Sequence, residues 1–179
     1  CNIHQNMMLD QSTVRNMDLV QTGDGNRKGS LLDLLDLART PMGARRIREW
    51  ILKPLVDLKE IVNRHEIVDE FKSHLMFRNE IRGEFKEIYD LERLLGRISL
   101  SVCNARDLIA LKSSLRALPK IGELLGLCKT EAVTRYTQGW DNLQDIRQLI
   151  ESLIVDDPPF NLKEGNVIKS GCDAELDRL

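Results

Sequence analysis

The strongest constraint on the fold is the run of residues 29–55, GSLLDLLDLARTPMGARRIREWILKPL, which indicates two consecutive helices. Four apolar residues recur at helical spacing after the N-cap candidate Ser30, namely Leu31, Leu34, Leu35 and Ala38. A helix with leucines concentrated on one face has to bury that face against another element. The run therefore predicts a helical fold whose core is built largely from leucine.

A second helix is predicted directly after the first. Thr40 is an N-cap candidate, and Pro41 occupies the first helical position, where a missing N–H costs nothing. Pro54 stops this helix. Its buried face is predicted from the apolar positions Ala44, Ile47 and Ile51.

Length and composition limit the class of protein. A chain of 179 residues forms one domain, or one domain and a fragment of another. Its 26 basic and 28 acidic residues give a net charge of −2, the wrong balance for a stand-alone nucleic-acid-binding protein. It has neither an apolar run of about 20 residues nor a signal peptide, so we expect no membrane partner and a cytoplasmic location. A start at Cys1 rather than Met indicates an excised piece of a longer protein. The four cysteines lie far apart in the sequence, which indicates free thiols rather than disulfides.

Capping signals predict further helices downstream. Asp57 with Glu60 resembles a capping box, Asp90 caps a short helix, and Asn104 caps a longer one. The predicted buried stripes are Leu58, Ile61, Val62, Val68 and Phe71; Phe77, Ile81, Phe85 and Ile88; Leu91, Leu94, Leu95 and Ile98; and Leu108, Leu111, Leu115 and Leu118. The last stripe alternates spacings of three and four, and it covers too few heptads for a free coiled coil. We therefore expect it to pack internally.

The C-terminal part of the chain carries weaker signals. A break is expected at Leu118-Pro119, and residues 128–139 form a looser region. The apolar pattern of residues 143–154 predicts the last full helix, which the prolines of residues 156–159 end. Asp173 begins a helix over residues 173–179 that the end of the chain truncates.

A small β element is predicted at the two ends of the chain. Met7–Leu9 is expected to form a strand, and Met17–Gln21 a strand or short helix after a polar turn. A short strand is expected around residues 166–169, paired with one near the N-terminus. The predicted fold class is therefore mainly α, a multi-helix bundle with a small β element, in a single domain segment over residues 1–179.

The residues show no signature of an enzyme. Residues 22–29 form a glycine-rich loop, but the order Lys28-Gly29-Ser30 departs from the Gly-Lys-Ser/Thr of a phosphate-binding loop. His65 lies in an apolar stripe without a second ligand three or four positions away, so we expect a core or semi-buried histidine. Carboxylate pairs and serines lack the surroundings of an acid–base pair or a nucleophile. The sequence therefore predicts no catalytic, cofactor-binding or metal-binding residue in this chain.

The most distinctive polar feature is the basic segment Arg39–Lys53. It sets five cations, Arg39, Arg45, Arg46, Arg48 and Lys53, against Glu49 alone. Arg45, Arg46 and Arg48 are candidates for a contact with phosphate or an acidic partner. The plainer interpretation is a solvated helix face whose arginine stems cover apolar surface, and the net acidic remainder of the chain favours it.

Five blocks of this sequence resemble, in order, the core segment of the MutS family of DNA mismatch-repair proteins. The first is residues 29–55. The others are Met8-Leu9-Asp10 with Thr13 and Asn16; DLERLLGRI at residues 90–98; RDLIALKSSL at residues 106–115; and Asp157-Pro158-Pro159 leading to Gly171, Asp173 and Glu175-Leu176-Asp177. Each block is weak alone, but five in register across nearly the whole chain are specific. The bacterial, mismatch-recognising branch is the better match.

The resemblance implies a place within a larger protein. In that family the matching segment is the first half of the core or lever domain, ending where the DNA clamp is inserted, so we expect a mechanical role that links ATPase state to clamp position. The resemblance implies that the family's mismatch-reading motif and its Walker motifs belong to other parts of the parent protein. The resemblance thus implies that ATP and Mg, mismatched duplex DNA, a MutL-type partner and a second MutS subunit are bound by the parent protein. The alternative hypothesis is an independent helical adaptor that docks an acidic partner through the basic helix, residues 41–52.

Overall fold

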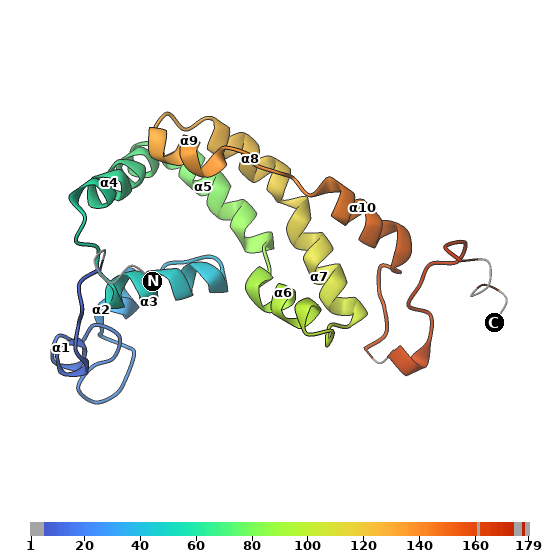
Figure 1. The fold of residues 1–179 in the computed structure, drawn as a ribbon, viewed down its shortest axis with the longest axis horizontal. Helices are drawn as coiled ribbons and strands as arrows, with labels where there is room; N and C mark the ends of the chain where they lie inside the picture. Colours follow the sequence, from blue (N-terminus) through green and yellow to red (C-terminus); the bar gives the residue numbers. More distant parts are fainter. Residues whose placement is uncertain (1–5, 161, 174–176, 178–179) are drawn as a thin grey trace. The chain divides into compact units, whose positions relative to one another are not determined.

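Helices dominate the computed structural model, which describes residues 6–160, 162–173 and 177 (Figure 1). The helices are α1 (Gln11–Asn16), α2 (Leu31–Leu35), α3 (Pro41–Leu52), α4 (Leu58–Ser73), α5 (Leu75–Glu84), η1 (Phe85–Glu87), α6 (Leu91–Ser99), α7 (Ala105–Arg116), α8 (Leu118–Gly126), α9 (Glu131–Thr137), α10 (Gln144–Leu153) and η2 (Leu162–Glu164). Across these residues the β structure consists of two isolated bridges. The prediction of a mainly α fold is confirmed.

Side-chain caps determine where many of these helices begin. Ser30 accepts a hydrogen bond from the backbone N–H of Asp33, and Thr40 accepts one from Gly43 with Pro41 at the first turn. The predicted caps Asp57, Asp90 and Asn104 are confirmed in the same way. Each cap satisfies backbone donors that a helix start leaves unpaired, which stabilises the start by about 1 kcal/mol.

The chain divides into two compact units. Unit 1 comprises Cys1–Arg82 and Cys128–Tyr136, and unit 2 comprises Gly83–Leu127 and Thr137–Leu179. In unit 1, α2 packs against α3; in unit 2, α7 packs against α6, α8 and α10. The single domain segment over residues 1–179 stays a prediction.

The core of unit 2 lies where α7 meets α6 and α10 (Figure 1). Its buried members are Leu94, Ala105, Leu111, Leu115, Ile150 and Ile154. Leu115 is 2% exposed, and the half-buried Leu108 and Leu118 pack beside this cluster. The stripe predicted over Leu108–Leu118 therefore packs internally, as expected.

The predicted buried face of α2 is wrong. Leu32 is the buried residue, whereas Leu34 is 73% exposed and Leu31 and Leu35 are also exposed. The helix is only five residues long, and the backbone N–H groups of Leu31 and Leu32 donate to the carbonyls of Asp18 and Leu19. These contacts hold the helix with Leu32 turned inward, next to a buried Leu19.

The stripe predicted for α4 is also partly wrong. Leu58, Val62 and Val68 are exposed, whereas Ile61 and Phe71 are half-buried as expected. The half-buried surface instead includes Arg64 and Ile67. This rotation of the buried face leaves His65 exposed, which contradicts the expectation of a core or semi-buried histidine.

Of the β predictions, only the segment around residues 166–169 holds in place, and its predicted pairing is wrong. Asn6 bridges Leu55, and Ile168 bridges Ile154, so the segment around residues 166–169 pairs beside α10 rather than with the N-terminus. Helix α10 ends at Leu153, before the prolines, and the chain returns on itself so that Val155 donates its N–H to the carbonyl of Val167 at 3.1 Å. The loop between them is short, so its closure costs little entropy. The strand predicted at Met7–Leu9 is absent, and the polar turn after it is α1, because Asp10 caps a helix through the N–H of Thr13.

One of two further predictions in the C-terminal part of the chain is wrong. The region at residues 128–139 expected to be loose contains α9, with Ala132 and Val133 buried. The truncated helix predicted over residues 173–179 falls largely outside the described residues. The loop predicted over residues 22–29 is confirmed.

Candidate functional sites

The basic segment Arg39–Lys53 presents its charges on α3. Ala44, Ile47 and Ile51 are half-buried on one face of this helix. Arg45, Arg46 and Arg48 are exposed. The helix geometry therefore agrees with the separation of apolar and basic faces that the spacing predicts.

Part of this charge is neutralised within the helix. The Glu49 carboxylate accepts from the Arg46 guanidinium at 3.0 Å and from the Lys53 ammonium at 3.5 Å. Arg45 also makes an interaction of its own, whereas Arg48 is exposed and forms no ion pair with any described residue. Exposed pairs of this kind contribute little stability. A contact of Arg45, Arg46 and Arg48 with phosphate or an acidic partner stays a prediction, as does the adaptor hypothesis for residues 41–52.

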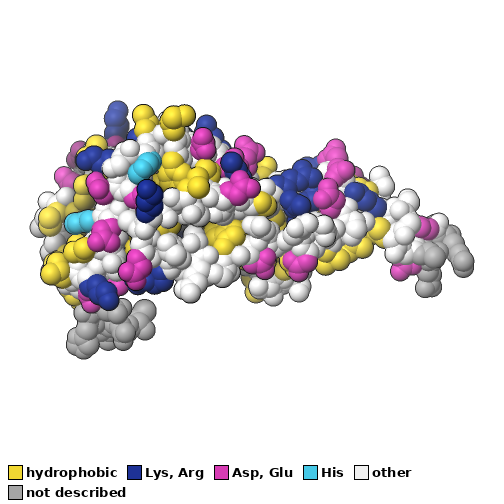
Figure 2. All heavy atoms as spheres, turned by 90° about the horizontal axis from the view of Figure 1, so that it is seen from above, with side chains coloured by type: hydrophobic (Ala, Val, Ile, Leu, Met, Phe, Trp, Pro, Cys, Tyr) yellow, Lys and Arg dark blue, Asp and Glu magenta, His cyan; other side chains and the backbone are white. Residues whose placement is uncertain are grey.

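Basic and acidic side chains are interspersed on the face of the molecule seen in Figure 2. A duplex DNA footprint needs several cations that neutralise successive phosphates. The face shown carries no continuous field of that kind.

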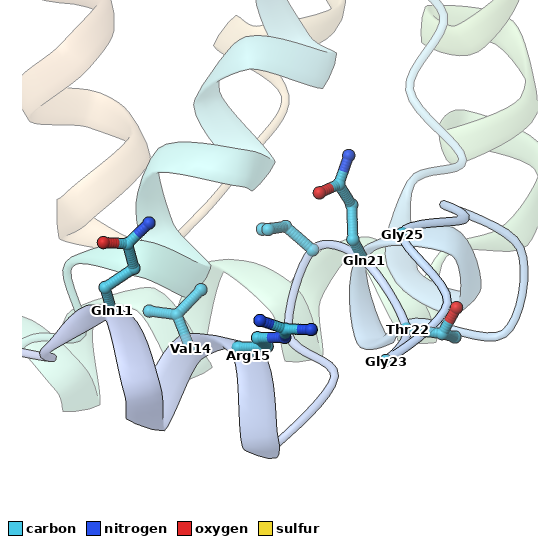
Figure 3. A pocket seen from close by; sticks show the side chains of 8 residues that line it. Gln11, Val14, Arg15, Gln21, Thr22, Gly23 and Gly25 are labelled. Carbon is cyan, nitrogen blue, oxygen red and sulfur yellow. The ribbon is translucent and has the colours of Figure 1, made fainter.

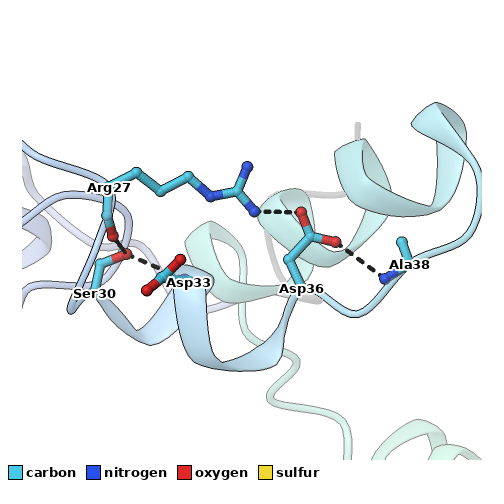
Figure 4. A network of polar contacts seen from close by, with 5 residues as sticks. All are labelled: Arg27, Ser30, Asp33, Asp36 and Ala38. Atoms are coloured by element: carbon cyan, nitrogen blue, oxygen red, sulfur yellow. Dashed lines mark hydrogen bonds and ion pairs between the residues drawn. The ribbon is translucent and has the colours of Figure 1, made fainter.

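A polar network holds the chain that leads into α3 (Figure 4). The Arg27 guanidinium pairs with Asp36, whose other oxygen accepts from the N–H of Ala38 at 3.3 Å. Ser30 donates its hydroxyl to the carbonyl of Arg27 at 2.7 Å while it caps α2. The short extended segment between α2 and α3 is thus bonded to the preceding loop.

The guanidinium of Arg64 in α4 lies 3.9 Å from the centre of the Trp50 ring in α3. A cation over an indole face is attracted by the ring quadrupole. This contact joins α3 to α4 within unit 1.

In unit 2, the start of α7 is held by a complete capping box. The Asn104 side chain accepts from the N–H of Asp107, and the Asp107 carboxylate accepts from the N–H of Asn104, both at 2.9 Å. Arg97 of α6 donates to the same carboxylate at 2.8 Å. Burial works to raise the pKa of Asp107, but the hydrogen bonds from Asn104 and Arg97 outweigh it and hold the pKa below its usual value.

The middle of α7 carries a buried lysine. The Lys112 side chain is 3% exposed, and its ammonium lies 2.8 Å from the carboxylate of Asp156, just beyond the end of α10. The hydrogen bond and charge of Lys112 lower the pKa of Asp156. Near the end of α7, Arg116 pairs with Glu151 of α10 at 3.3 Å. We call Arg97–Asp107, Lys112–Asp156 and Arg116–Glu151 the α7 ion pairs.

In unit 1, Glu70 of α4 forms hydrogen bonds with the segment that leads into α9. The Glu70 carboxylate accepts from the backbone N–H groups of Lys129 and Thr130 and from the Thr130 hydroxyl. Burial works to raise the pKa of Glu70, but the hydrogen bonds from Thr130 and Lys129 outweigh it and lower the pKa.

Sequence reasoning missed Lys112, Asp156 and Glu70. A signal for Lys112 was present, because a charged residue directly beside Leu111 in an apolar stripe needs a partner when it is buried. Nothing local identifies that partner, which lies 44 positions away.

Within the described part of the chain, no group of three His, Cys, Asp or Glu side chains is arranged to hold a metal ion. Likewise, no described helix is long and apolar enough to cross a membrane.

Comparison with known proteins relates the chain to mismatch repair. The family described as MutS domain III matches residues 12–178. The DNA mismatch repair protein MutS of Acetivibrio thermocellus is 43% identical over 178 residues, which are 99% of this chain and 20% of that protein. The proteins of the same name from Clostridium beijerinckii and Symbiobacterium thermophilum are 43% identical over 174 residues, or 97% of this chain. They are covered to 19% and 20%, so the chain spans about a fifth of the length of these curated relatives.

Proposed function

Because this chain belongs to the MutS family, matching its domain III, we propose that it is a structural lever that transmits the ATPase state of a parent protein to its DNA clamp. The predicted resemblance to bacterial MutS is thereby confirmed at the level of the family. The lever role goes further than family membership. It is supported by the ion pairs and the apolar packing that fix α7 against its neighbours.

The observation that carries the proposal is the fixation of α7 along its length. A helix of 12 residues is about 18 Å long, and the α7 ion pairs contact it near its start, at its middle and at its end. Their partners belong to α6, to the segment after α10, and to α10. A displacement of α7 is therefore carried to both neighbouring helices.

Packing supports the same conclusion. Leu111 and Leu115 of α7 are buried against a cluster that includes Ile150 of α10 and Leu94 of α6. Close-packed helices move as rigid bodies rather than deforming continuously, which is what mechanical coupling between distant sites requires.

The proposal assigns the chemistry to the parent protein. ATP and Mg, a second MutS subunit and a MutL-type partner are bound by the parent, a bacterial cytoplasmic protein, which also binds mismatched duplex DNA, though not mainly through this segment. This chain contributes stiffness and connection, and no catalytic step.

The test uses a full-length chimera. This chain replaces the matched fifth of the Acetivibrio thermocellus MutS, and the buried Lys112→Met is compared with Lys120→Met. Lys120 is a matched control, because it is half-exposed and, among the residues that the structure describes, pairs only with Glu123 of its own helix at 3.3 Å. The measured quantity is the ratio of mismatched-DNA affinities with and without ATP.

We expect Lys112→Met to reduce this ratio by about tenfold, a typical coupling free energy, while ATP hydrolysis without DNA is retained. Lys120→Met leaves the ratio unchanged. The milder Asp156→Asn provides a second variant if Lys112→Met fails to fold. An unchanged ratio in whichever of the Lys112→Met and Asp156→Asn chimeras folds refutes the lever role.

A further inference from the structure

A pocket of about 340 Å³ lies in unit 1 between α1 and the loop that follows it (Figure 3). Its lining includes Gln11, Val14, Arg15, Val20, Gln21 and Thr22. We propose that this pocket binds the carboxylate of an aspartate or glutamate side chain on a protein partner. The proposal is independent of the lever role, because it concerns other residues and a different unit.

One wall of the pocket comes from a single face of α1. Gln11, Val14 and Arg15 are three and four positions apart, so they project from the same side of the helix. Figure 3 shows the Arg15 guanidinium between α1 and the segment that carries Gln21 and Thr22. Arg15 lines the pocket while its side chain stays exposed, so an incoming ligand can reach the cation.

The opposite wall is built by a bonded turn. Thr22 donates its N–H to the carbonyl of Asn26 at 2.8 Å, and Gly25 donates to the carbonyl of Thr22 at 2.8 Å. Gly25 adopts a φ of 77°, in the left-handed region that favours glycine. The N–H of Leu19 also donates to the carbonyl of Val14, which joins this segment to α1. The pocket is therefore formed before any ligand binds.

The charge of the pocket is unbalanced. Arg15 is the only ionisable side chain among the lining residues, and it makes no ion pair with any residue that the structure describes. Asp10, which caps α1, is bonded instead to the N–H of Thr13 and the hydroxyl of Ser12. An arginine in a pocket without a carboxylate favours an anionic ligand.

The donor set fits a carboxylate better than a nucleic-acid backbone. One planar guanidinium matches one carboxylate through two parallel hydrogen bonds. Duplex DNA binding relies on several cations along successive phosphates, yet Lys28 does not line the pocket and Arg27 is paired with Asp36.

The remaining lining indicates a peptide. Val14 and Val20 offer apolar surface to the methylene groups of an acidic side chain or to its neighbours. Gln11 and Gln21 carry carboxamides, which donate to and accept from peptide groups. These features together favour an acidic side chain within an apolar segment.

The experiment titrates the full chain, labelled with ¹⁵N, with a blocked Val-Glu-Val peptide, and follows the backbone amide of Thr22 and the side-chain amides of Gln11 and Gln21. The matched ligand is blocked Val-Gln-Val, and sodium acetate reports binding of a free carboxylate. The matched protein variants are Arg15→Gln in the pocket and Arg135→Gln on α9, since both arginines are exposed and Arg135 lies outside the pocket.

We expect saturable shifts with the glutamate peptide, an affinity about tenfold lower with the glutamine peptide and with acetate, and a similar loss in Arg15→Gln. Arg135→Gln retains the wild-type affinity. Equal affinity for the two peptides, equal affinity in Arg15→Gln, or the absence of saturable shifts overturns the proposal. It is also overturned if a short duplex DNA shifts these resonances and the glutamate peptide does not.

Discussion

The adjacent residues Leu94 and Leu95 in α6 provide a sharp test of the structure. The spacing of apolar residues places both on one face, but Leu94 is 7% exposed within the core of unit 2 and Leu95 is 53% exposed. We expect Leu94→Ala to lower the free energy of unfolding by about 3 kcal/mol, since it removes buried contacts and leaves a cavity. Leu95→Ala removes a side chain that is already half in water, so its expected effect is about 1 kcal/mol or less. The difference of about 2 kcal/mol corresponds to about thirtyfold in the folding equilibrium constant.

Urea unfolding of the full chain measures both values. Trp140 belongs to unit 2 and Trp50 to unit 1, so a Trp50→Phe background makes tryptophan fluorescence report on unit 2. Both substitutions replace leucine by alanine inside the same helix, so helix propensity cancels in the comparison. Equal destabilisation by the two variants, or a larger effect of Leu95→Ala, would refute the orientation of α6 described here.

Two other predictions concern α8 and α9. A Cβ at Gly122 would lie 2.6 Å from Nε1 of Trp140, so Gly122→Ala is expected to destabilise the chain by about 1–3 kcal/mol and to shift the Trp140 emission. Gly126→Ala in the same helix meets no atom within 4 Å and serves as the control, and equal thermal midpoints for the two variants would contradict the contact. The lowered pKa of Glu70 means that its contribution to stability is present above the unfolded-state pKa and is lost as the pH falls through the folded-state pKa. The difference in unfolding free energy between wild type and Glu70→Gln should therefore shrink from about pH 7 to about pH 3, and a constant difference would argue against the contact with Thr130.

Local signals predicted the helix boundaries well. Ser30, Thr40 and Asn104 each cap a helix as expected, because the hydrogen bond of a cap joins residues only three positions apart. The same local chemistry explains an error at the N-terminus. Asp10 carries a capping signal with Thr13, and the tendency of Met7–Leu9 toward a strand obscured it.

The candidate sites were less predictable. The basic face of α3 followed from spacing alone, but the sharing of Glu49 by Arg46 and Lys53 reduces its free charge. The pocket beside α1 had no sequence signal, because it needs Arg15 of a helix and the turn at Thr22 to face each other. A loop with a plain glycine-rich composition becomes the wall of a pocket only through that arrangement.

The sequence by itself determined the helical class and the helix starts at Ser30, Thr40 and Asn104, because capping bonds and apolar periods act over three or four residues. The MutS family was indicated separately, by the resemblance of five sequence blocks. Only the tertiary structure decided which leucine of α2 is buried and which carboxylate faces Lys112. Those outcomes depend on contacts between distant positions, 44 apart for Lys112 and Asp156 and 60 apart for Glu70 and Thr130. Such pairs form only when the long loop between their residues closes, which costs chain entropy. No local sequence pattern therefore predicts them.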